Sequence, residues 1–464
     1  MAANTIFISA FSHSPIGNFS VPGGVFELLA EHKKPDTQVI LLVTKDEHYE
    51  KIREASYIKN GAITVHQVPL YEPKRLAVKI FRFFYAYLIF TGTTKTLATL
   101  GARADMPPAG GNRHLAFVKS AIANTIGKIP AVKKQLVPWL FDRIFNERPY
   151  AHLFEKYQPD LVFAANMAMV PDSELLAEAK RRGVKTLGMV CNWDHLNKYF
   201  IPRQADYLIA QNEPMRREAV EFQGYEPEQI TVTGFPKFDI YPTIAKYTMN
   251  REEFLRHFNI PQNAKLILFI SGSAYSLDEG DILETISNWI KEGNLDKNAH
   301  LLIRPYVTLR DRKQEEAKYK KLMTDPTIAF NWMKGDESGK PRELYLGMLA
   351  HADVVISMFS TTAIEAALLD KPTIAIGFDG YAKRPPHQSI RRMETMHHFK
   401  NVLDTGNVPV ARNFDELKSM IESYLATPSK DRDKRMDIVR KLCHGGDGLA
   451  SNRVTEIILS HAAA

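Results

Sequence analysis

The sequence predicts an α/β protein with two doubly wound, parallel-sheet domains of similar size that face each other across a cleft. Short apolar runs alternate with helical patterns along most of the 464 residues. The runs are apolar on both faces, as expected for parallel strands that helices cover on either side. The alternation forms two series, which two prolines and a glycine separate at 234–246.

The composition is that of an ordinary globular chain, with 45% hydrophobic and 24% charged residues. Cys191 and Cys443 lie far apart, and no second Cys or His stands near either at metal-ligand spacing. The sequence therefore predicts neither a disulfide framework nor a zinc site, and a reducing cytoplasm is the simplest location. The N-terminus has no basic region and only a short apolar run, so we expect no signal peptide or membrane-spanning helix there.

The first domain is predicted to span residues 1–240 and to carry a helical insert at 73–140. Its strand candidates are the apolar runs at 5–9, 38–44, 62–68, 160–165, 184–190, 206–211 and 229–234. Helical patterns such as DSELLAEAKRRG at 172–183 separate the later strands, as the crossovers of a parallel sheet require.

The insert carries the basic charge of the chain. It contains eleven Lys or Arg against one acidic residue, Asp105, although the formal net charge of the whole chain is only +7. It also contains the aromatic run KIFRFFYAYLIF at 79–90. Apolar and aromatic residues flanked by cations are typical of an interfacial element that binds an anionic lipid surface. The residues expected to bind the membrane are Arg75, Lys79, Arg82, Phe83 and Phe84.

The alternative is that this run is an ordinary core helix with solvated lysines around it. A nucleic-acid partner is not expected. No nucleic-acid-binding signature accompanies the charge, and the aromatic residues cluster with aliphatic ones, whereas stacking on bases requires aromatics interleaved with cations.

The second domain is predicted at 247–440, and a C-terminal helix follows at 441–464. The strand candidates of this domain are the runs at 265–271, 299–305, 327–332, 352–357 and 372–377. They alternate with helical patterns in the same way as those of the first domain, so a second parallel sheet is predicted.

Three consecutive hydroxyl residues, Ser360, Thr361 and Thr362, lie at the turn between the strand at 352–357 and the next helix. Open α/β sheets bind ligands at the carboxyl ends of their strands, and a helix N-terminus favours phosphate. Glu365 follows one turn later, where its carboxylate is placed to accept hydrogen bonds from two vicinal ribose hydroxyls. The alternative is that Thr362 and Glu365 form a capping box and bind nothing.

The stretch HADVVISMFSTTAIEAALLDKPTIAIGFDG at 351–380 resembles the donor-binding strand and helix of nucleotide-sugar enzymes with two Rossmann-like domains, the GT-B glycosyltransferase fold. More narrowly, the chain is similar to bacterial surface-carbohydrate and capsule-biosynthesis proteins related to the CDP-glycerol glycerophosphotransferases. With the stretches at 159–198, 231–241 and 446–458, the likeness covers about two thirds of the chain. That group more often shows Ser-Trp-Asp-Asn where this chain has Asn-Trp-Asp-His at 192–195.

The resemblance implies a donor site in the second domain. The implied donor- and nucleotide-binding residues are Ser271, Gly272, Ser273, Arg304, Ser360, Thr361, Thr362, Glu365 and Asp379. Arg304 would clamp a diphosphate, and its alternative is a surface arginine after a strand. Gly272 would allow a close backbone approach to the ligand. Asp379 would reach the donor sugar or merely form a turn.

The first domain is expected to supply the general base. Asp194 and His13 are both candidates because each follows a predicted strand, and Asp194 comes first because the resemblance supports it. Asp194 fits a helix cap equally well. The charge of the leaving diphosphate is assigned to amide, hydroxyl and guanidinium donors, so we expect no metal ion and no other cofactor.

These inferences favour a glycosyltransferase that moves a sugar from a nucleotide-sugar donor to a lipid-linked or polysaccharide acceptor in bacterial capsule or O-antigen biosynthesis. A CDP-alditol phosphotransferase of teichoic-type polymer synthesis and a UDP-N-acetylglucosamine 2-epimerase-like isomerase stay open as alternatives, as does a non-enzymatic nucleotide-sugar binding module. The basic insert predicts a cytoplasmic protein held peripherally on the inner face of the plasma membrane.

Overall fold

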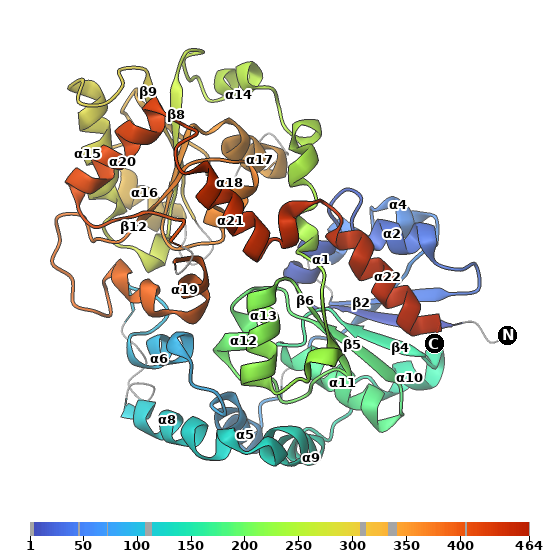
Figure 1. Ribbon diagram of the computed structural model, residues 1–464. Helices are drawn as coiled ribbons and strands as arrows, with labels where there is room; N and C mark the ends of the chain where they lie inside the picture. The colour runs from blue at the N-terminus through green and yellow to red at the C-terminus, as the bar shows by residue number, and fades with distance from the viewer. Residues whose placement is uncertain are drawn as a thin grey trace. The chain divides into compact units, whose positions relative to one another are not determined.

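The computed structural model describes residues 4–44, 47–71, 73–106, 114–306, 312–332, 341–403 and 406–463. The chain divides into two compact units (Figure 1). Unit 1 comprises Met1–Thr94, Phe117–Ile240 and Lys441–Ala464, and unit 2 comprises Lys95–Ala116 and Tyr241–Arg440. In the described part of the chain, no helix is long and apolar enough to cross a membrane.

Unit 1 contains a seven-stranded sheet in which all neighbouring strands are parallel, in the order β3-β2-β1-β4-β5-β6-β7. The strands are β1 (Thr5–Ala10), β2 (Gln38–Thr44), β3 (Thr64–Val68), β4 (Leu161–Ala164), β5 (Lys185–Met189), β6 (Tyr207–Ala210) and β7 (Ile230–Val232). Each of these strands overlaps a predicted apolar run, so the local sequence pattern was sufficient to locate the strands.

Helices cover both faces of this sheet, because alternate residues of a strand point to opposite sides. On β1, Ile6 and Ile8 pack in one core cluster with residues of α2 (Val25–His32) and α22 (Ala450–Ala463). Phe7 packs in another cluster with residues of α10 (Ala151–Tyr157) and α11 (Val170–Arg181). The remaining helices of this unit are α1 (His13–Phe19), α3 (Glu47–Ile52), α4 (Ser56–Lys59), α12 (His195–Lys198) and α13 (Glu213–Glu218).

The C-terminal helix α22 belongs to unit 1, where it lies against α2 (Figure 1). The Asp239 carboxylate accepts hydrogen bonds from the backbone N–H groups of Ala450 (3.0 Å) and Ser451 (2.6 Å) at the start of this helix. Two of the N–H groups that a helix start leaves unsatisfied are thereby bonded. The chain thus returns to the first sheet after completing unit 2.

The predicted insert consists of helices and is divided between the units. It contains α5 (Leu76–Ala86), α6 (Gly92–Thr99), α8 (Ala116–Asn124) and the short helices η1 (Ile126–Lys128) and η2 (Val132–Leu136), and α9 (Val137–Ile144) follows. Val78, Phe81 and Tyr85 on one face of α5 pack with Phe141 and Phe145 in a separate core cluster.

The segment Lys95–Ala116 groups with unit 2. The Ala104 N–H donates to the carbonyl of Ala274 at 2.7 Å, and the buried Arg392 guanidinium donates to the carbonyl of Ala102 at 3.3 Å. The basic charge that the sequence places in one insert is therefore shared between the two units.

Unit 2 contains a six-stranded parallel sheet in the order β10-β9-β8-β11-β12-β13. The strands are β8 (Lys265–Ile270), β9 (Ala299–Arg304), β10 (Ile328–Phe330), β11 (Val354–Ser357), β12 (Thr373–Ile376) and β13 (Val410–Ala411). The helices are α14 (Arg251–His257), α15 (Glu279–Lys291), α16 (Arg312–Tyr319), α17 (Pro341–His351), α18 (Thr362–Leu368), α19 (His397–Leu403), α20 (Phe414–Ala426) and α21 (Arg432–Leu442). The two parallel sheets confirm the predicted α/β class; the sequence analysis missed β13, whose two residues are too few for a pattern.

In each sheet the strand order reverses once, between β1 and β4 in unit 1 and between β8 and β11 in unit 2. Open α/β sheets bind ligands outside the carboxyl ends of the strands at such a reversal. In unit 2 this point lies beside Ser271–Ser273, after β8, and Ser360–Thr362, after β11.

Candidate functional site

In the hydroxyl turn after β11, the N-cap residue of the following helix does not cap it with its side chain. Helix α18 begins at Thr362, and the side chain of its N-cap residue, Thr361, makes no capping hydrogen bond. The Ser360 hydroxyl instead accepts a hydrogen bond from the Thr362 N–H at 3.3 Å. A capping box of Thr362 and Glu365 would need Thr362 as the N-cap residue, but Thr362 is the first residue of the helix. The Glu365 carboxylate has a different partner.

Glu365 is buried and accepts a hydrogen bond from the Tyr345 hydroxyl of α17 at 2.6 Å. Tyr345 also bonds Thr362, and Tyr241 makes a further hydrogen bond to Glu365. Burial, followed by the negative charge of Glu365, raises the pKa of both tyrosines well above the usual range. The carboxylate thus faces two hydroxyl donors and belongs to a polar cluster that the sequence pattern did not reveal.

Arg304 belongs to the same cluster. It ends β9, and its guanidinium carbon lies 4.2 Å from the centroid of the Tyr345 ring. Among the described residues, no carboxylate lies within ion-pair distance of this guanidinium. Burial lowers the pKa of Arg304, and the nearby Tyr345 and Glu365 oppose this change. A largely desolvated cation without a paired anion favours an anionic ligand.

The Ser-Gly-Ser turn after β8 is directed into the protein interior. The Ser271 hydroxyl donates to the Glu279 carboxylate at 2.7 Å, and the Ser273 hydroxyl donates to Glu315 at 2.8 Å. Both serines are buried. A Cβ on Gly272 would lie 2.8 Å from the Met358 side chain, so glycine is needed for packing against the segment after β11. These serine hydroxyls stabilise the turn, and neither is directed outward as the resemblance implied.

Asp379 also has a structural partner. Its carboxylate accepts a hydrogen bond from the Ile390 N–H at 2.8 Å and so closes the loop after β12. This arrangement fits the turn-forming alternative. Of the expected donor residues, the structure brings together Arg304, Glu365 and Thr362, and Tyr345, which was not predicted, contacts all three.

The Asn-Trp-Asp-His segment follows β5 in unit 1. Asp194 precedes α12 without a capping hydrogen bond, and its carboxylate lies 3.4 Å from the Lys198 ammonium and 3.9 Å from His195 Nε2. Burial lowers the pKa of His195, although Asp194 opposes this. Its Nδ1 is buried and has no hydrogen-bond partner in the part of the chain that the structure describes. The imidazole is therefore mainly neutral at physiological pH, as a general base must be.

A pocket of about 470 Å³ adjoins this segment within unit 1. Its walls come from α5, from the residues after β4 and from 195–202. The rings of Phe83, Tyr87 and Tyr199 line it together with the cations Arg82 and Lys198. Burial raises the pKa of Tyr87 to about 12, so the hydroxyl remains protonated. Aromatic rings and cations in one pocket suit a ligand with an apolar or sugar part and a phosphate.

His13 begins α1 after β1, but its side chain lies outside the described part of the structure. A buried carboxyl that the sequence analysis did not single out, Asp172, lies beside the end of β1. It accepts hydrogen bonds from the Ser9 hydroxyl and, at 3.2 Å, from the Asn166 N–H. Burial raises the pKa of Asp172 to about 7. No local signal distinguishes it, because Asp172 and Ser9 meet only in the folded sheet.

The residues expected at a membrane surface differ in exposure. Phe83 is half-buried with its ring centroid 5.2 Å from that of Tyr87, and Phe84 packs against the core of the insert. Arg75 forms an ion pair with Glu147 at 3.2 Å, whereas Lys79 and Arg82 are exposed.

Among the described residues of the insert, the most exposed apolar side chains are Phe117 on α8 (83% exposed) and Leu76 (71%) and Ile80 (62%) on α5. Ile80 lies next to Lys79, and Trp139 on α9 is 50% exposed.

The described residues contain no group of three or more His, Cys, Asp or Glu side chains arranged to hold a metal ion. Cys191 and Cys443 are both buried free thiols.

Comparisons with known proteins agree with this architecture. Residues 340–460 match the family model described as CDP-Glycerol:Poly(glycerophosphate) glycerophosphotransferase. This match includes Tyr345, the hydroxyl turn and Glu365, but neither Arg304 nor the Asn-Trp-Asp-His segment. A search of curated proteins finds no match.

Solved structures share the fold of the whole chain. A glycosyltransferase from Rickettsia africae is 12% identical, with 99% of each chain covered and a TM-score of 0.53. The UDP-GlcNAc 2-epimerase from Neisseria meningitidis, solved with UDP-GlcNAc bound, is 11% identical, with 98% of this chain and 100% of that chain covered and a TM-score of 0.56. The UDP-GlcNAc 2-epimerase from Methanocaldococcus jannaschii is 12% identical, with 98% and 99% covered and a TM-score of 0.53. The chain is therefore a protein with the GT-B fold, related over residues 340–460 to the CDP-glycerol glycerophosphotransferases.

Proposed function

We propose that the protein is a metal-independent glycosyltransferase that uses a nucleotide-sugar donor and a lipid-linked or polysaccharide acceptor in bacterial surface-polysaccharide synthesis. The observation that carries the proposal is the cluster of Arg304, Tyr345 and Glu365 beside the hydroxyl turn after β11. It joins a partly buried cation, which has no carboxylate within ion-pair distance among the described residues, to a buried carboxylate. A nucleotide presents a diphosphate and a ribose diol that these two groups can bind.

In this proposal the donor diphosphate lies against Arg304 and the hydroxyls of Ser360 and Thr361, while Glu365 accepts hydrogen bonds from the ribose. Tyr345 holds both groups in place, because its ring supports the guanidinium and its hydroxyl bonds the carboxylate. Because the Arg304 guanidinium is partly shielded from water, it stabilises the negative charge that develops on the leaving diphosphate more strongly than a fully solvated cation would.

The acceptor is proposed to bind in the aromatic pocket beside 192–195. The acceptor oxygen bonds to the anomeric carbon of the donor as the bond from that carbon to the diphosphate oxygen breaks. The acceptor proton passes to a base, for which Asp194 is our first candidate and His13 our second, and the nucleoside diphosphate leaves. The low pKa of His195 supports a role beside Asp194 as a neutral proton acceptor.

A CDP-alditol phosphotransferase is the second candidate, and the family match at 340–460 favours it. The same donor cluster suits this reaction, in which the acceptor oxygen attacks the phosphorus next to the alditol and CMP leaves. An isomerase related to the 2-epimerases would use the donor cluster but needs no second substrate.

The nucleotide that is released distinguishes these reactions. The purified protein is incubated with UDP-, GDP- and CDP-linked donors, with and without a membrane extract as the acceptor source, and nucleotides are separated by ion-exchange chromatography. Glycosyl transfer predicts acceptor-dependent release of a nucleoside diphosphate. Release of CMP from a CDP-alditol would establish the phosphotransferase instead. Conversion of a UDP-sugar without any acceptor would establish the isomerase and contradict the proposal.

We also propose that the protein is cytoplasmic and binds the inner face of the membrane peripherally. The exposed cations Lys74, Lys79 and Lys128 of unit 1 support this, together with the exposed Leu76 and Phe117. Each cation near an anionic lipid surface contributes about 1 kcal/mol. Such binding would bring the acceptor pocket, which α5 helps to form, to the surface where a lipid-linked acceptor is anchored.

A further inference from the structure

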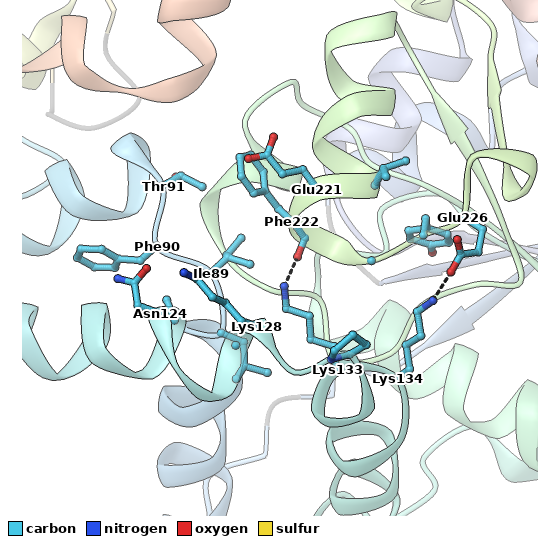
Figure 2. Close-up of a pocket in the computed structure, with 17 residues that line it drawn as sticks. Ile89, Phe90, Thr91, Asn124, Lys128, Lys133, Lys134, Glu221, Phe222 and Glu226 are labelled. Atoms are coloured by element: carbon cyan, nitrogen blue, oxygen red, sulfur yellow. Dashed lines mark hydrogen bonds and ion pairs between the residues drawn. The ribbon is translucent and has the colours of Figure 1, made fainter.

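A second pocket of unit 1, with a volume of about 560 Å³, opens between the insert and the segment after α13 (Figure 2). We call it the lysine pocket, because Lys128, Lys133 and Lys134 line it. Its other walls are formed by 88–91, the end of α8 and 220–226. A Cβ on Gly127 would lie only 2.2 Å from the carbonyl oxygen of Leu88, so glycine here allows η1 to pack directly against the facing wall.

The three lysines differ in their interactions, and Figure 2 shows those of Lys133 and Lys134. The Lys133 ammonium donates to the Phe222 carbonyl at 2.9 Å and lies 5.6 Å from the centroid of the Phe200 ring. Because a carbonyl uses one of its three N–H donors, two stay available to a ligand. Lys134 forms an ion pair with Glu226. In the described parts of the chain, no carboxylate lies within ion-pair distance of Lys128.

The lining holds two acids, Glu221 and Glu226, against these three lysines, so its net charge is positive. Burial lowers the pKa of Lys133, which means that an anion bound beside this ammonium would relieve an existing electrostatic cost. Within unit 1 the lysine pocket therefore favours a small anionic group near Lys128 and Lys133.

Exposed apolar residues neighbour the lysines in the sequence. Ile126 and Ile129 lie on either side of Lys128, Leu136 follows Lys134, and Val220 itself lines the pocket. These four side chains are between 37% and 49% exposed. Phe117 lies on the same face of α8 as the pocket residue Asn124, about 10 Å further along the helix axis.

We propose that the lysine pocket binds the phosphate headgroup of an anionic membrane lipid, while Ile126, Ile129 and Leu136 contact its acyl chains. A free phosphate or a soluble sugar phosphate presents the same charge to Lys128 and Lys133. Only a lipid also has an apolar part that matches the exposed side chains next to these lysines. A pocket of this size is ample for a phosphoglycerol headgroup.

This inference rests on the peripheral membrane binding proposed above and is independent of the transfer reaction. It adds a specific site to the general attraction between cations and an anionic surface. General attraction depends on the number of cations and little on their positions, whereas a headgroup site depends on Lys128 in particular.

The test uses the full-length protein and a short-chain phosphatidylglycerol below its micellar concentration, so that no charged surface is present. Binding is measured by isothermal titration calorimetry for the wild type, for Lys128→Gln and for the matched control Lys79→Gln, which removes an exposed cation of α5 outside the pocket. A hydrogen-bonded ion pair contributes about 1.5–3 kcal/mol, so Lys128→Gln should weaken binding about tenfold or more. The control should bind as the wild type does.

A second set of titrations distinguishes a lipid headgroup from a soluble phosphate as the ligand of the lysine pocket. Inorganic phosphate and glycerol phosphate should bind at least about tenfold more weakly than the short-chain lipid, because they lack the apolar contacts. Ile129→Gln should weaken lipid binding without changing the affinity for glycerol phosphate. The control Met323→Gln changes an exposed apolar residue outside the insert and should have no effect on either affinity.

Equal loss of binding in Lys128→Gln and Lys79→Gln would overturn the headgroup site and leave only a general surface attraction. Equal affinity for glycerol phosphate and for the lipid would show that the pocket takes a soluble phosphate. A wild type that binds neither the short-chain lipid nor anionic vesicles would contradict both this inference and the proposed membrane binding, while donor turnover would still report on the transferase.

Discussion

Glu365 is the residue on which the proposed donor site depends most. Its carboxylate accepts a hydrogen bond from the Tyr345 hydroxyl at 2.6 Å. A cap would place it at the backbone of its own helix, but its partners come from α17 and from Tyr241. A carboxylate supported in this way is fixed in position and retains acceptor capacity for a ligand.

Glu365→Gln should weaken nucleotide binding about tenfold or more, because each hydrogen bond to a charged group contributes about 1.5–3 kcal/mol. Glutamine keeps an acceptor for Tyr345, so the melting temperature should change little. Calorimetric titration with UDP, GDP and CDP measures the affinity. Unchanged affinity together with a lower melting temperature would mean that Glu365 is a structural residue.

The partly buried guanidinium of Arg304 leads to a prediction about metal ions. If Arg304 and the hydroxyl turn bind the diphosphate and stabilise its charge without a metal ion, donor turnover should persist in EDTA at an unchanged rate. Arg304→Lys should lower kcat, because an ammonium lacks the planar pair of donors. Turnover that EDTA abolishes and magnesium or manganese restores would show that a divalent ion carries the diphosphate charge.

Glu174 on α11 is buried, and among the described residues neither of its carboxylate oxygens has a hydrogen-bond partner. Burial raises the pKa of this group to about 8, although Arg181 opposes the change. The folded state therefore holds this proton more tightly than the unfolded chain does. The stabilisation is fully present below about pH 4.5 and is lost as the pH rises through about 8.

Glu174→Gln should therefore stabilise the protein, and the gain should be larger at pH 8.5 than at pH 5. Each pKa unit is worth about 1.4 kcal/mol, so the expected difference is a few kcal/mol at most. Urea unfolding at several pH values measures it. An equal gain at both pH values would contradict the raised pKa.

Glu178, one turn further along α11, is the matched control. Burial would raise its pKa, but hydrogen bonds from Arg148 and Arg182 outweigh this effect and lower the pKa to about 2. Glu178→Gln should therefore destabilise the protein at neutral pH, in the opposite direction to Glu174→Gln.

At the scale of elements, helix α22 depends on a residue far away in the sequence. The Asp239 carboxylate bonds the first N–H groups of α22, and Val454 and Ile458 on this helix pack in the core of the first sheet. The Arg453 guanidinium adds a hydrogen bond to the Thr233 carbonyl at 2.8 Å.

Asp239→Ala should lower the free energy of unfolding by about 1–3 kcal/mol, because two helix N–H groups lose a charged acceptor. Limited proteolysis should then cut within 441–464 sooner than in the wild type. Asp239→Asn retains one acceptor and should show a smaller effect. Equal protease resistance in all three proteins would show that packing alone holds α22.

The insert shows how an amphipathic pattern is used inside a domain. Val78, Phe81 and Tyr85 of α5 are buried, so much of the aromatic run serves as core. Lys119 is also fully buried, with its ammonium 4.3 Å from the centroid of the Tyr87 ring. The ordinary-core alternative thus describes one face of α5, while Leu76 and Lys79 lie on the exposed face.

At the scale of the whole molecule, the exposed cations of unit 1 predict salt-sensitive binding to anionic vesicles. Lys74→Glu with Lys79→Glu should reduce pelleting about tenfold or more, since each cation contributes about 1 kcal/mol. High salt should release part of the wild type, because charges are screened beyond about 8 Å at physiological ionic strength. Equal binding to neutral and anionic vesicles would contradict the prediction.

The sequence by itself determined the local elements and the two-domain class. The predicted strand at 38–44 is β2, and the run at 352–357 contains β11, because strands that helices cover on both faces must be apolar along their length. It also predicted Glu365 and Arg304 as donor-site residues, since the carboxyl ends of parallel strands form the ligand-binding edge of a sheet, and that role stays a prediction.

Only the tertiary structure decided which side chains meet. Ser271 and Ser273 turn inward because Glu279 and Glu315, on other elements, accept their hydrogen bonds. Tyr345 joins Arg304 to Glu365, although the three residues come from α17, β9 and α18. The return of α22 to the first sheet likewise depends on Asp239. A local pattern reports whether a position is apolar, but the partner of a polar group is set by folding, because residues distant in sequence become neighbours only then.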